Sequence, residues 1–442
     1  MIILRYELKK ILTSKLTVAV IIVLYALDVF LLLTGTLSLK PADPFTHVTG
    51  IHGTTEDTYI EIQKQTSQYA GEITQEWYEG LLAEYDAYIN DPANRLSDEE
   101  LFSLANHWRE YGWSEEEIED MLNSTYYTVR EPEFPINAAL RNAQSIVYAP
   151  QDIDGSLLEF EGWQDLVKMH GEGISSYYKE RYPGVVGETL SDKAKEMYDG
   201  LAENFTPYYN YDYGWWQMQG MHRAFPITVG LALAVALGSL FTADRARGTE
   251  GIVFATRHGR RKLIYAKIGA GFIFTFLLWL VLEITNAALI LIIYGPTGWE
   301  AVWSLIGGVS APFMFNQSQI TLVTIVTSLF GTFMAAGMVM LVSALAKSQY
   351  ASLIINAALL IVPMLNTVKI YIFGAESFME TVMDFFPGRI MGAINEWESL
   401  DLLYVFGNAV PTEYLIIPVA VIFGAAITAA SFFIYRRRQP AN

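Results

Sequence analysis

The chain has 442 residues, of which 52% are hydrophobic, with a formal net charge of −18 and a mean hydropathy of +0.26. These values together exclude a single soluble domain, and the acidic excess argues against a nucleic-acid-binding protein. The two properties separate along the sequence. Residues 38–223 hold about 34 acidic residues against about 12 basic ones, and apolar runs dominate from residue 224 onward. Cysteine is absent, which excludes disulfide and thiolate chemistry.

Residues 1–15 carry apolar and basic residues at helical spacing, Tyr6 and Lys10 among them. This pattern predicts either an amphipathic helix on the inner leaflet or a charged flank that orients the first span. The apolar stretch that follows predicts a first transmembrane helix over residues 16–37. We favour a retained span over a cleaved signal peptide, because the apolar run is long and residues 34–36 make a poor cleavage site.

Residues 38–223 predict a large extracytoplasmic domain that is mainly helical. One run of large apolar side chains recurs every four residues, which is the spacing of a single helical stripe. Its members are Tyr69, Ile73, Trp77, Leu81 and Tyr85. Helical spacing returns over residues 157–182 and again after Ser191.

Helix starts and an aromatic cluster are also readable in this domain. Ser97 and Ser114 are each followed three residues later by a glutamate, Glu100 and Glu117, which is the capping-box pattern of a helix start. Tyr and Trp then crowd residues 208–216, just before the next apolar run. The simplest interpretation is an interfacial belt of aromatic residues, and a substrate-binding aromatic face is the alternative.

Residues 224–442 predict transmembrane helices 2–6. The five apolar runs cover residues 225–241, 263–294, 320–345, 351–373 and 414–435. Six spans place both termini in the cytoplasm, and the clusters of Lys and Arg then all fall on the inner side. The predicted fold class is therefore an all-α polytopic membrane protein of six transmembrane helices, with the large domain between helices 1 and 2.

The densest cluster of Lys and Arg lies in residues 240–267, between two predicted spans. A short loop this basic stays in the cytoplasm. The loop is also patterned: Asp244-Arg245 and Gly248-Thr249 precede a short apolar turn, and residues 256–260 then lead to Lys267.

This pattern resembles the first cytoplasmic loop of ABC-2 type transporter permeases, in which a short coupling helix docks on the ATPase subunit. The sequence departs from the family in having Asp244 where Glu is commoner, and residues 257–259 where a Pro is usual. The resemblance implies that loop 244–262 is the coupling loop. It assigns the coupling role to Asp244, Arg245, Arg247, Gly248, Thr249, Arg260 and Lys267.

The resemblance extends to the connection over residues 374–412. Many ABC-2 permeases fold this connection into two short helices that dip into the outer leaflet, and the amphipathic run around Phe385 and Trp397 is similar. The alternative is an ordinary helical surface loop.

No phosphate-binding loop of the form G-x-x-x-x-G-K-[ST] occurs in the chain. The expectation is a non-enzymatic permease without cofactor, metal or catalytic residues, with ATP and Mg²⁺ on a partner ATPase. His47 and His52 are too few for a zinc site. By family analogy the partners are an ABC ATPase subunit, a second permease chain in a homodimer or heterodimer, and the lipid bilayer. Nucleic acid is not expected.

Three ionisable residues, Asp28, Glu283 and Lys369, fall in the outer halves of predicted spans. Charges at this depth indicate either function or mutual pairing. We favour pairing, with the three residues forming one charged layer in which Lys369 neutralises a carboxylate.

These observations predict the permease subunit of an ATP-driven exporter in a bacterial plasma membrane. The acidic outer domain would attract cationic partners, which favours export of, or protection against, antimicrobial peptides. One alternative is a membrane sensor or scaffold whose outer domain binds a ligand without transport. A four-span mechanotransmission protein is a second alternative, and the six predicted spans and the basic loop argue against it.

Overall fold

The computed structural model describes residues 2–35, 59–123, 128–129, 162–204, 207–249, 251, 261–303, 311–364, 378–392, 397 and 399–437. These residues are mostly helical and divide into two compact units. The first unit comprises Met1–Leu32, Gln217–Leu289 and Gln319–Asn442, and the second comprises Leu33–Trp216 and Ile290–Ser318.

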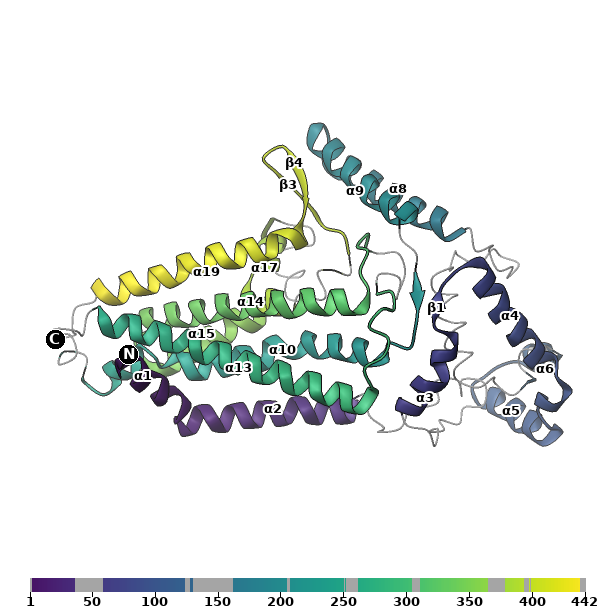
Figure 1. The fold of residues 1–442 in the computed structure, drawn as a ribbon, viewed down its shortest axis with the longest axis horizontal. Coiled ribbons are helices and arrows are strands. Elements are labelled where there is room, and N and C mark those ends of the chain that lie inside the picture. The colour runs from purple at the N-terminus through teal and green to yellow at the C-terminus, as the bar shows by residue number, and fades with distance from the viewer. Residues whose placement is uncertain are drawn as a thin grey trace. The chain divides into compact units, whose positions relative to one another are not determined.

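The first unit is a bundle of long apolar helices. They are α2 (Lys15–Gly35), α10 (Tyr213–Gly238), α13 (Lys262–Tyr294), α14 (Gln317–Leu345), α15 (Gln349–Ile361) and α19 (Thr412–Arg437). These helices run along one common direction, and the short α1 (Ile2–Leu12) lies at the same end of the bundle as the end of α19 (Figure 1). A tight turn of residues 346–348 joins α14 to α15, between the predicted spans 320–345 and 351–373.

Among the described residues, α10, α13, α14 and α19 are each long and apolar enough to cross a membrane. Helices α1 and α2 pass the same test as a pair, with a 54° bend between them. The predicted fifth span is described only as far as residue 364, through α15 and a 3-10 turn (Val362–Met364). The structure therefore supports a multi-pass membrane protein, and the number of six spans stays a prediction.

Small residues let the helices of the bundle approach closely. A Cβ added at Gly271 of α13 would lie 2.9 Å from Sδ of Met340 in α14. A Cβ added at Gly337 of α14 would lie 2.9 Å from Oγ1 of Thr428 in α19. Small residues at such crossings are the usual means of packing helices in a membrane, where apolar side chains gain little by leaving lipid.

The predicted connection 374–412 contains two short helices, α17 (Phe378–Asp384) and α18 (Pro387–Met391). Helix α18 is buried, and a Cβ added at Gly331 of α14 would meet its backbone at 2.7 Å from the Met391 nitrogen. Helix α18 therefore packs inside the first unit, and its insertion into the outer leaflet stays a prediction. A hairpin of β3 (Leu402–Val405) and β4 (Asn408–Pro411) follows, which the all-α prediction does not contain. Its turn places Phe406 and Gly407 at φ 48° and 88°, as two-residue hairpin turns require.

The second unit holds the acidic half of the chain. Its helices are α3 (Tyr59–Thr66), α4 (Gln75–Asn90), α5 (Asp98–Glu110), α6 (Glu115–Asn123), α8 (Gly162–Arg181) and α9 (Val185–Asn204). Strands β1 (Gly71–Glu72) and β2 (Tyr208–Tyr209) pair antiparallel, and α8 and α9 pack against each other. Helix α9 begins six residues before Ser191, the residue after which the sequence pattern predicts that helical spacing returns.

Both predicted capping boxes are present. Glu100 accepts from the Ser97 backbone nitrogen at 2.8 Å while Ser97 Oγ accepts from the Glu100 nitrogen at 3.3 Å, at the start of α5. Ser114 and Glu117 repeat this arrangement with the same distances at the start of α6.

The predicted continuous stripe from Tyr69 to Tyr85 is wrong in its first half. Helix α4 begins only after Thr74, whose side chain accepts from the Trp77 nitrogen, and Ile73 follows β1. The apolar residues nevertheless form one core, because β1 carries Ile73 to the face of α4 that buries Leu81. Trp77 is half-buried, and its indole nitrogen donates to the Tyr69 carbonyl at 2.9 Å.

The prediction of an interfacial belt over residues 208–216 is also wrong in part. Tyr209 packs in the same core as Ile73 and Leu81, and Tyr211 is buried too. Trp216, at the end of the cluster, is exposed. The first half of the aromatic run therefore contributes to the interior of the second unit.

Asp212, which directly precedes α10, is expected to make the stability of this unit depend on pH. Burial raises its pKa to about 7, against a smaller opposing effect of the hydrogen bond from Gln317 Nε2 at 2.5 Å. The folded state then holds a proton that the unfolded state releases, so stability should fall as pH rises from about 4 to about 7, by roughly 2–4 kcal/mol. Hydrogen exchange of segment 207–216 measures this.

Asp212→Asn keeps the acceptor for Gln317 and removes the titration. Exchange protection in the variant should equal that of the natural chain near pH 4.5 and exceed it near pH 7.5. Equal protection at both pH values would contradict the raised pKa.

Candidate functional site

The candidate site lies at the end of the first unit where α10 turns into α13. Helix α11 (Thr242–Ala246) follows the end of α10 after three intervening residues. Gly248, two residues beyond the end of α11, has a φ of 67°, the left-handed conformation that glycine adopts most easily. The backbone nitrogen and Oγ1 of Thr249 then donate to the Asp244 carbonyl at 3.0 and 3.1 Å. The Gly-Thr pair of the motif therefore closes the end of α11.

A buried group of charges holds α11 to the bundle. Lys267 of α13 is 1% exposed, and its Nζ donates to the Leu240 carbonyl at 2.7 Å. The same Nζ lies 3.1 Å from Oδ2 of Asp244 and 3.5 Å from Oε2 of Glu7 in α1. The structure thus brings together Asp244 and Lys267, which are 23 positions apart in the sequence, and adds Glu7.

Helix α1 joins this ion cluster through one face. Glu7 and Ile11, one turn apart, are both buried, and Leu4 lies against Gly269 of α13. Lys10 Nζ reaches both oxygens of Glu7 at 2.9 and 3.0 Å, from a position that is partly exposed. The four ionic side chains therefore balance in charge, which is what a buried cluster needs to be stable.

Helix α11 is also tied to the end of α14. Arg245 donates from Nη1 to the Ala346 carbonyl at 2.9 Å, and the Phe241 backbone nitrogen donates to Ser343 Oγ at 3.0 Å. These bonds connect the loop after α10 with the turn between α14 and α15.

The predicted coupling residues divide into buried and accessible groups. Asp244 and Lys267 are buried and can only position the loop, whereas Arg247 and Gly248 are exposed. Arg245 and Thr249 lie between these extremes. Arg260 and the apolar turn before it lie outside the described residues.

A second polar network is buried elsewhere in the bundle. His222 of α10 places Nε2 at 3.1 Å from both carboxylate oxygens of Glu283 in α13. Ser328 Oγ of α14 donates to Glu283 at 3.1 Å and accepts from the Trp279 indole nitrogen at 3.0 Å. Three helices are therefore joined around one carboxylate.

The three residues of the predicted charged layer have different surroundings. Asp28 accepts from Thr228 Oγ1 at 2.5 Å, while Glu283 pairs with His222. Lys369 lies outside the described residues, so its pairing with either carboxylate stays a prediction.

Sequence reasoning missed Glu7 and His222. The sequence signal that could have identified Glu7 is that it is a lone acidic residue within the basic N-terminal segment. His222 was assigned to the domain before the second span, because α10 begins 12 residues before the apolar run that defined that span.

Within the described residues, no group of three or more His, Asp or Glu side chains is placed to hold a metal ion. The arrangement at the α11 end is one of mechanical linkage: a short helix with an exposed tip is bound through charges to α1, α13 and α14. Together with the apolar helices, it defines a multi-pass membrane protein with a short, basic inter-helix loop.

The chain belongs to the ABC-2 family of transporter proteins, because the family model described as "ABC-2 family transporter protein" matches residues 1–383. Members of this family are membrane permeases of ABC transporters, typically without enzymatic activity, and membership implies association with an ABC ATPase. No curated protein and no solved structure matches the chain.

Proposed function

We propose that the chain is the permease subunit of an ATP-driven exporter and works with a separate ATPase chain. The observation that carries this proposal is the exposed tip of α11, Arg247-Gly248, held to the bundle by the buried pair Asp244–Lys267. A tip that touches the ATPase can transmit force only if it is rigidly attached to the spans. The cluster supplies that attachment on three sides.

In this proposal, ATP binding moves the ATPase against the α11 tip. The tip transmits the movement to α13 through Lys267, to α1 through Glu7, and to α14 through Arg245. ATP and Mg²⁺ are bound by the ATPase alone, and the permease changes the inclination of its helices. Two permease chains, identical or related, would form the pathway between them.

We place both termini and α11 in the cytoplasm of a bacterial cell, and the second unit outside. The excess of basic residues around α11 and the end of α19 supports this orientation. The strongly acidic second unit would concentrate cationic molecules near the pathway. This favours a role in exporting cationic antimicrobial peptides or in protecting the cell against them.

Replacing Arg247 by Glu should weaken association with the ATPase at least tenfold, which is about 1.4 kcal/mol. The reason is that the substitution reverses a charge at the exposed tip and touches no buried contact. The measurement is the ATP hydrolysis that co-purifies with the tagged chain from native membranes.

Lys179→Glu, an exposed charge reversal on α8 of the second unit, is the matched control and should leave the co-purified hydrolysis unchanged. Equal hydrolysis in both variants would contradict the assignment of the tip. A chain that carries no hydrolysis at all would favour the sensor or scaffold alternative.

A further inference from the structure

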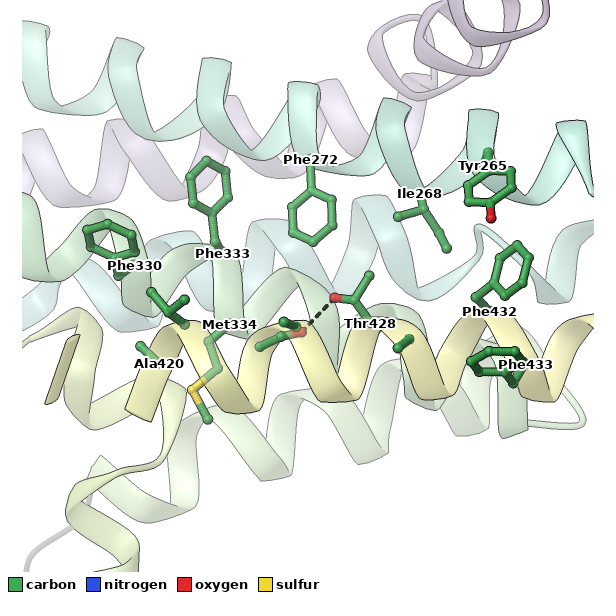
Figure 2. Close-up of a pocket in the computed structure, with 14 residues that line it drawn as sticks. Tyr265, Ile268, Phe272, Phe330, Phe333, Met334, Ala420, Thr428, Phe432 and Phe433 are labelled. Atoms are coloured by element: carbon green, nitrogen blue, oxygen red, sulfur yellow. Dashed lines mark hydrogen bonds between the residues drawn. The ribbon is translucent and has the colours of Figure 1, made fainter. Parts of the chain in front are cut away.

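A long apolar groove runs along the first unit between α13 and α19, with α14 as its floor (Figure 2). Its volume is about 710 Å³. Tyr265, Phe432 and Phe433 lie at one end of the view, and Phe330 and Ala420 lie at the other. Between these ends, Phe272 points from α13 toward α19, whereas the Phe333 ring extends from α14 away from α19, and the two ring centroids are 5.8 Å apart.

The groove offers almost no polar group to an occupant. Thr428 lies at its middle, but its hydroxyl donates to the Gly424 carbonyl of its own helix at 2.7 Å (Figure 2). The Tyr265 hydroxyl is the other polar side-chain atom of the lining. A hydrocarbon chain therefore matches the walls, and a polar or charged solute does not.

One end of the groove is bordered by positive charge. Tyr265 lies three and four residues after Lys262 and Arg261, and Phe433 lies three and four residues before Arg436 and Arg437. Residues at these spacings share a helix face. All four basic side chains are exposed. The apolar groove thus ends in a basic mouth, at the end of the bundle that also carries α11.

The length of the groove fits half of a bilayer. Along α19 the lining extends from Ala420 to Phe433, which is about 20 Å at 1.5 Å per residue. The hydrocarbon of one leaflet is about 15 Å thick. An acyl chain lying in the groove would therefore bring its phosphate close to the four basic residues.

We propose that this groove is a binding site for an anionic phospholipid of the inner leaflet. One acyl chain lies between α13 and α19, and the phosphate binds at Arg261, Lys262, Arg436 and Arg437. The charge of the mouth selects an anionic headgroup over a zwitterionic one, as basic pockets between transmembrane helices do. The bound lipid joins α13, which carries Lys267, to α19.

The test is native mass spectrometry of the full chain purified in detergent and titrated with phosphatidylglycerol or phosphatidylcholine. Phosphatidylglycerol should bind more tightly than phosphatidylcholine. Arg436→Gln with Arg437→Gln should weaken phosphatidylglycerol binding roughly fivefold per neutralised residue. Equal binding of the two lipids to the natural chain would overturn the proposal.

A matched pair of variants tests the groove apart from the charges. Ala429 lines the groove and Ala426 does not, and both are exposed on α19. Ala429→Trp should fill the groove and abolish the preference for phosphatidylglycerol, while Ala426→Trp should leave it intact. Equal lipid binding by the two variants would overturn the proposal. So would a loss of dimer in Ala429→Trp with lipid binding unchanged, since the groove would then hold a second copy of the chain.

Discussion

Lys267→Met is expected to lower the stability of the chain by about 3–5 kcal/mol, which is the usual cost of stranding buried charges. The substitution leaves Asp244 and Glu7 without the ammonium that lies near both carboxylates, and within the described part of the chain only Glu7 keeps a second ionic partner, Lys10. It also removes the donor to the Leu240 carbonyl. Chemical denaturation of the purified chain in detergent measures the loss.

Two further variants make this prediction specific. Lys15→Met removes an exposed lysine from α2 and should change stability by less than about 1 kcal/mol. Combining Lys267→Met with Asp244→Asn should cost less than the sum of the two single changes, because the single lysine variant strands an anion that the double variant lacks. Strict additivity would contradict the ion cluster.

His222→Leu is expected to lower the free energy of unfolding by about 3 kcal/mol, which is the second largest of the predicted effects. The histidine is the partner of both carboxylate oxygens of Glu283, and the variant leaves Ser328 as the remaining hydrogen-bond donor among the described contacts. A charged side chain at membrane depth without a partner carries a cost of this size. The same denaturation experiment measures it.

A double variant separates the pairing from simple loss of packing. His222→Leu with Glu283→Leu should be more stable than His222→Leu alone, because no unpaired carboxylate remains. Thr285→Val is the control on α13, since that hydroxyl only bonds to backbone carbonyls of its own helix. If the double variant is less stable than the single one, the network contributes through packing and the pairing account fails.

The features that could be predicted from the sequence are those set by neighbouring residues. The capping boxes at Ser97 and Ser114 depend on residues three positions apart, and both are present. The apolar helices are equally local, because length and composition alone decide whether a helix can cross a bilayer. The family resemblance depends mainly on closely spaced residues of the loop 244–262, with the connection 374–412 as a second similarity, and the family match supports it.

The features that were missed depend on distant parts of the chain. Glu7 joins Lys267 across 260 positions, and no spacing rule connects them. Tyr209 belongs to a residue type that is common at membrane interfaces, but the pairing of β1 with β2 places it in the core beside Ile73. Short-range patterns cannot distinguish an aromatic residue at a membrane surface from one in a protein core.

The most direct test of the central claim is site-specific crosslinking from the α11 tip. The chain has no cysteine, so Arg247→Cys provides a single attachment point for a photoreactive label, and Lys179→Cys provides the control on α8. We expect the label at position 247, activated in native membranes, to capture a protein that contains a phosphate-binding loop, and the label at position 179 not to do so. Absence of an ATPase adduct at position 247, or equal adducts at both positions, would contradict the account.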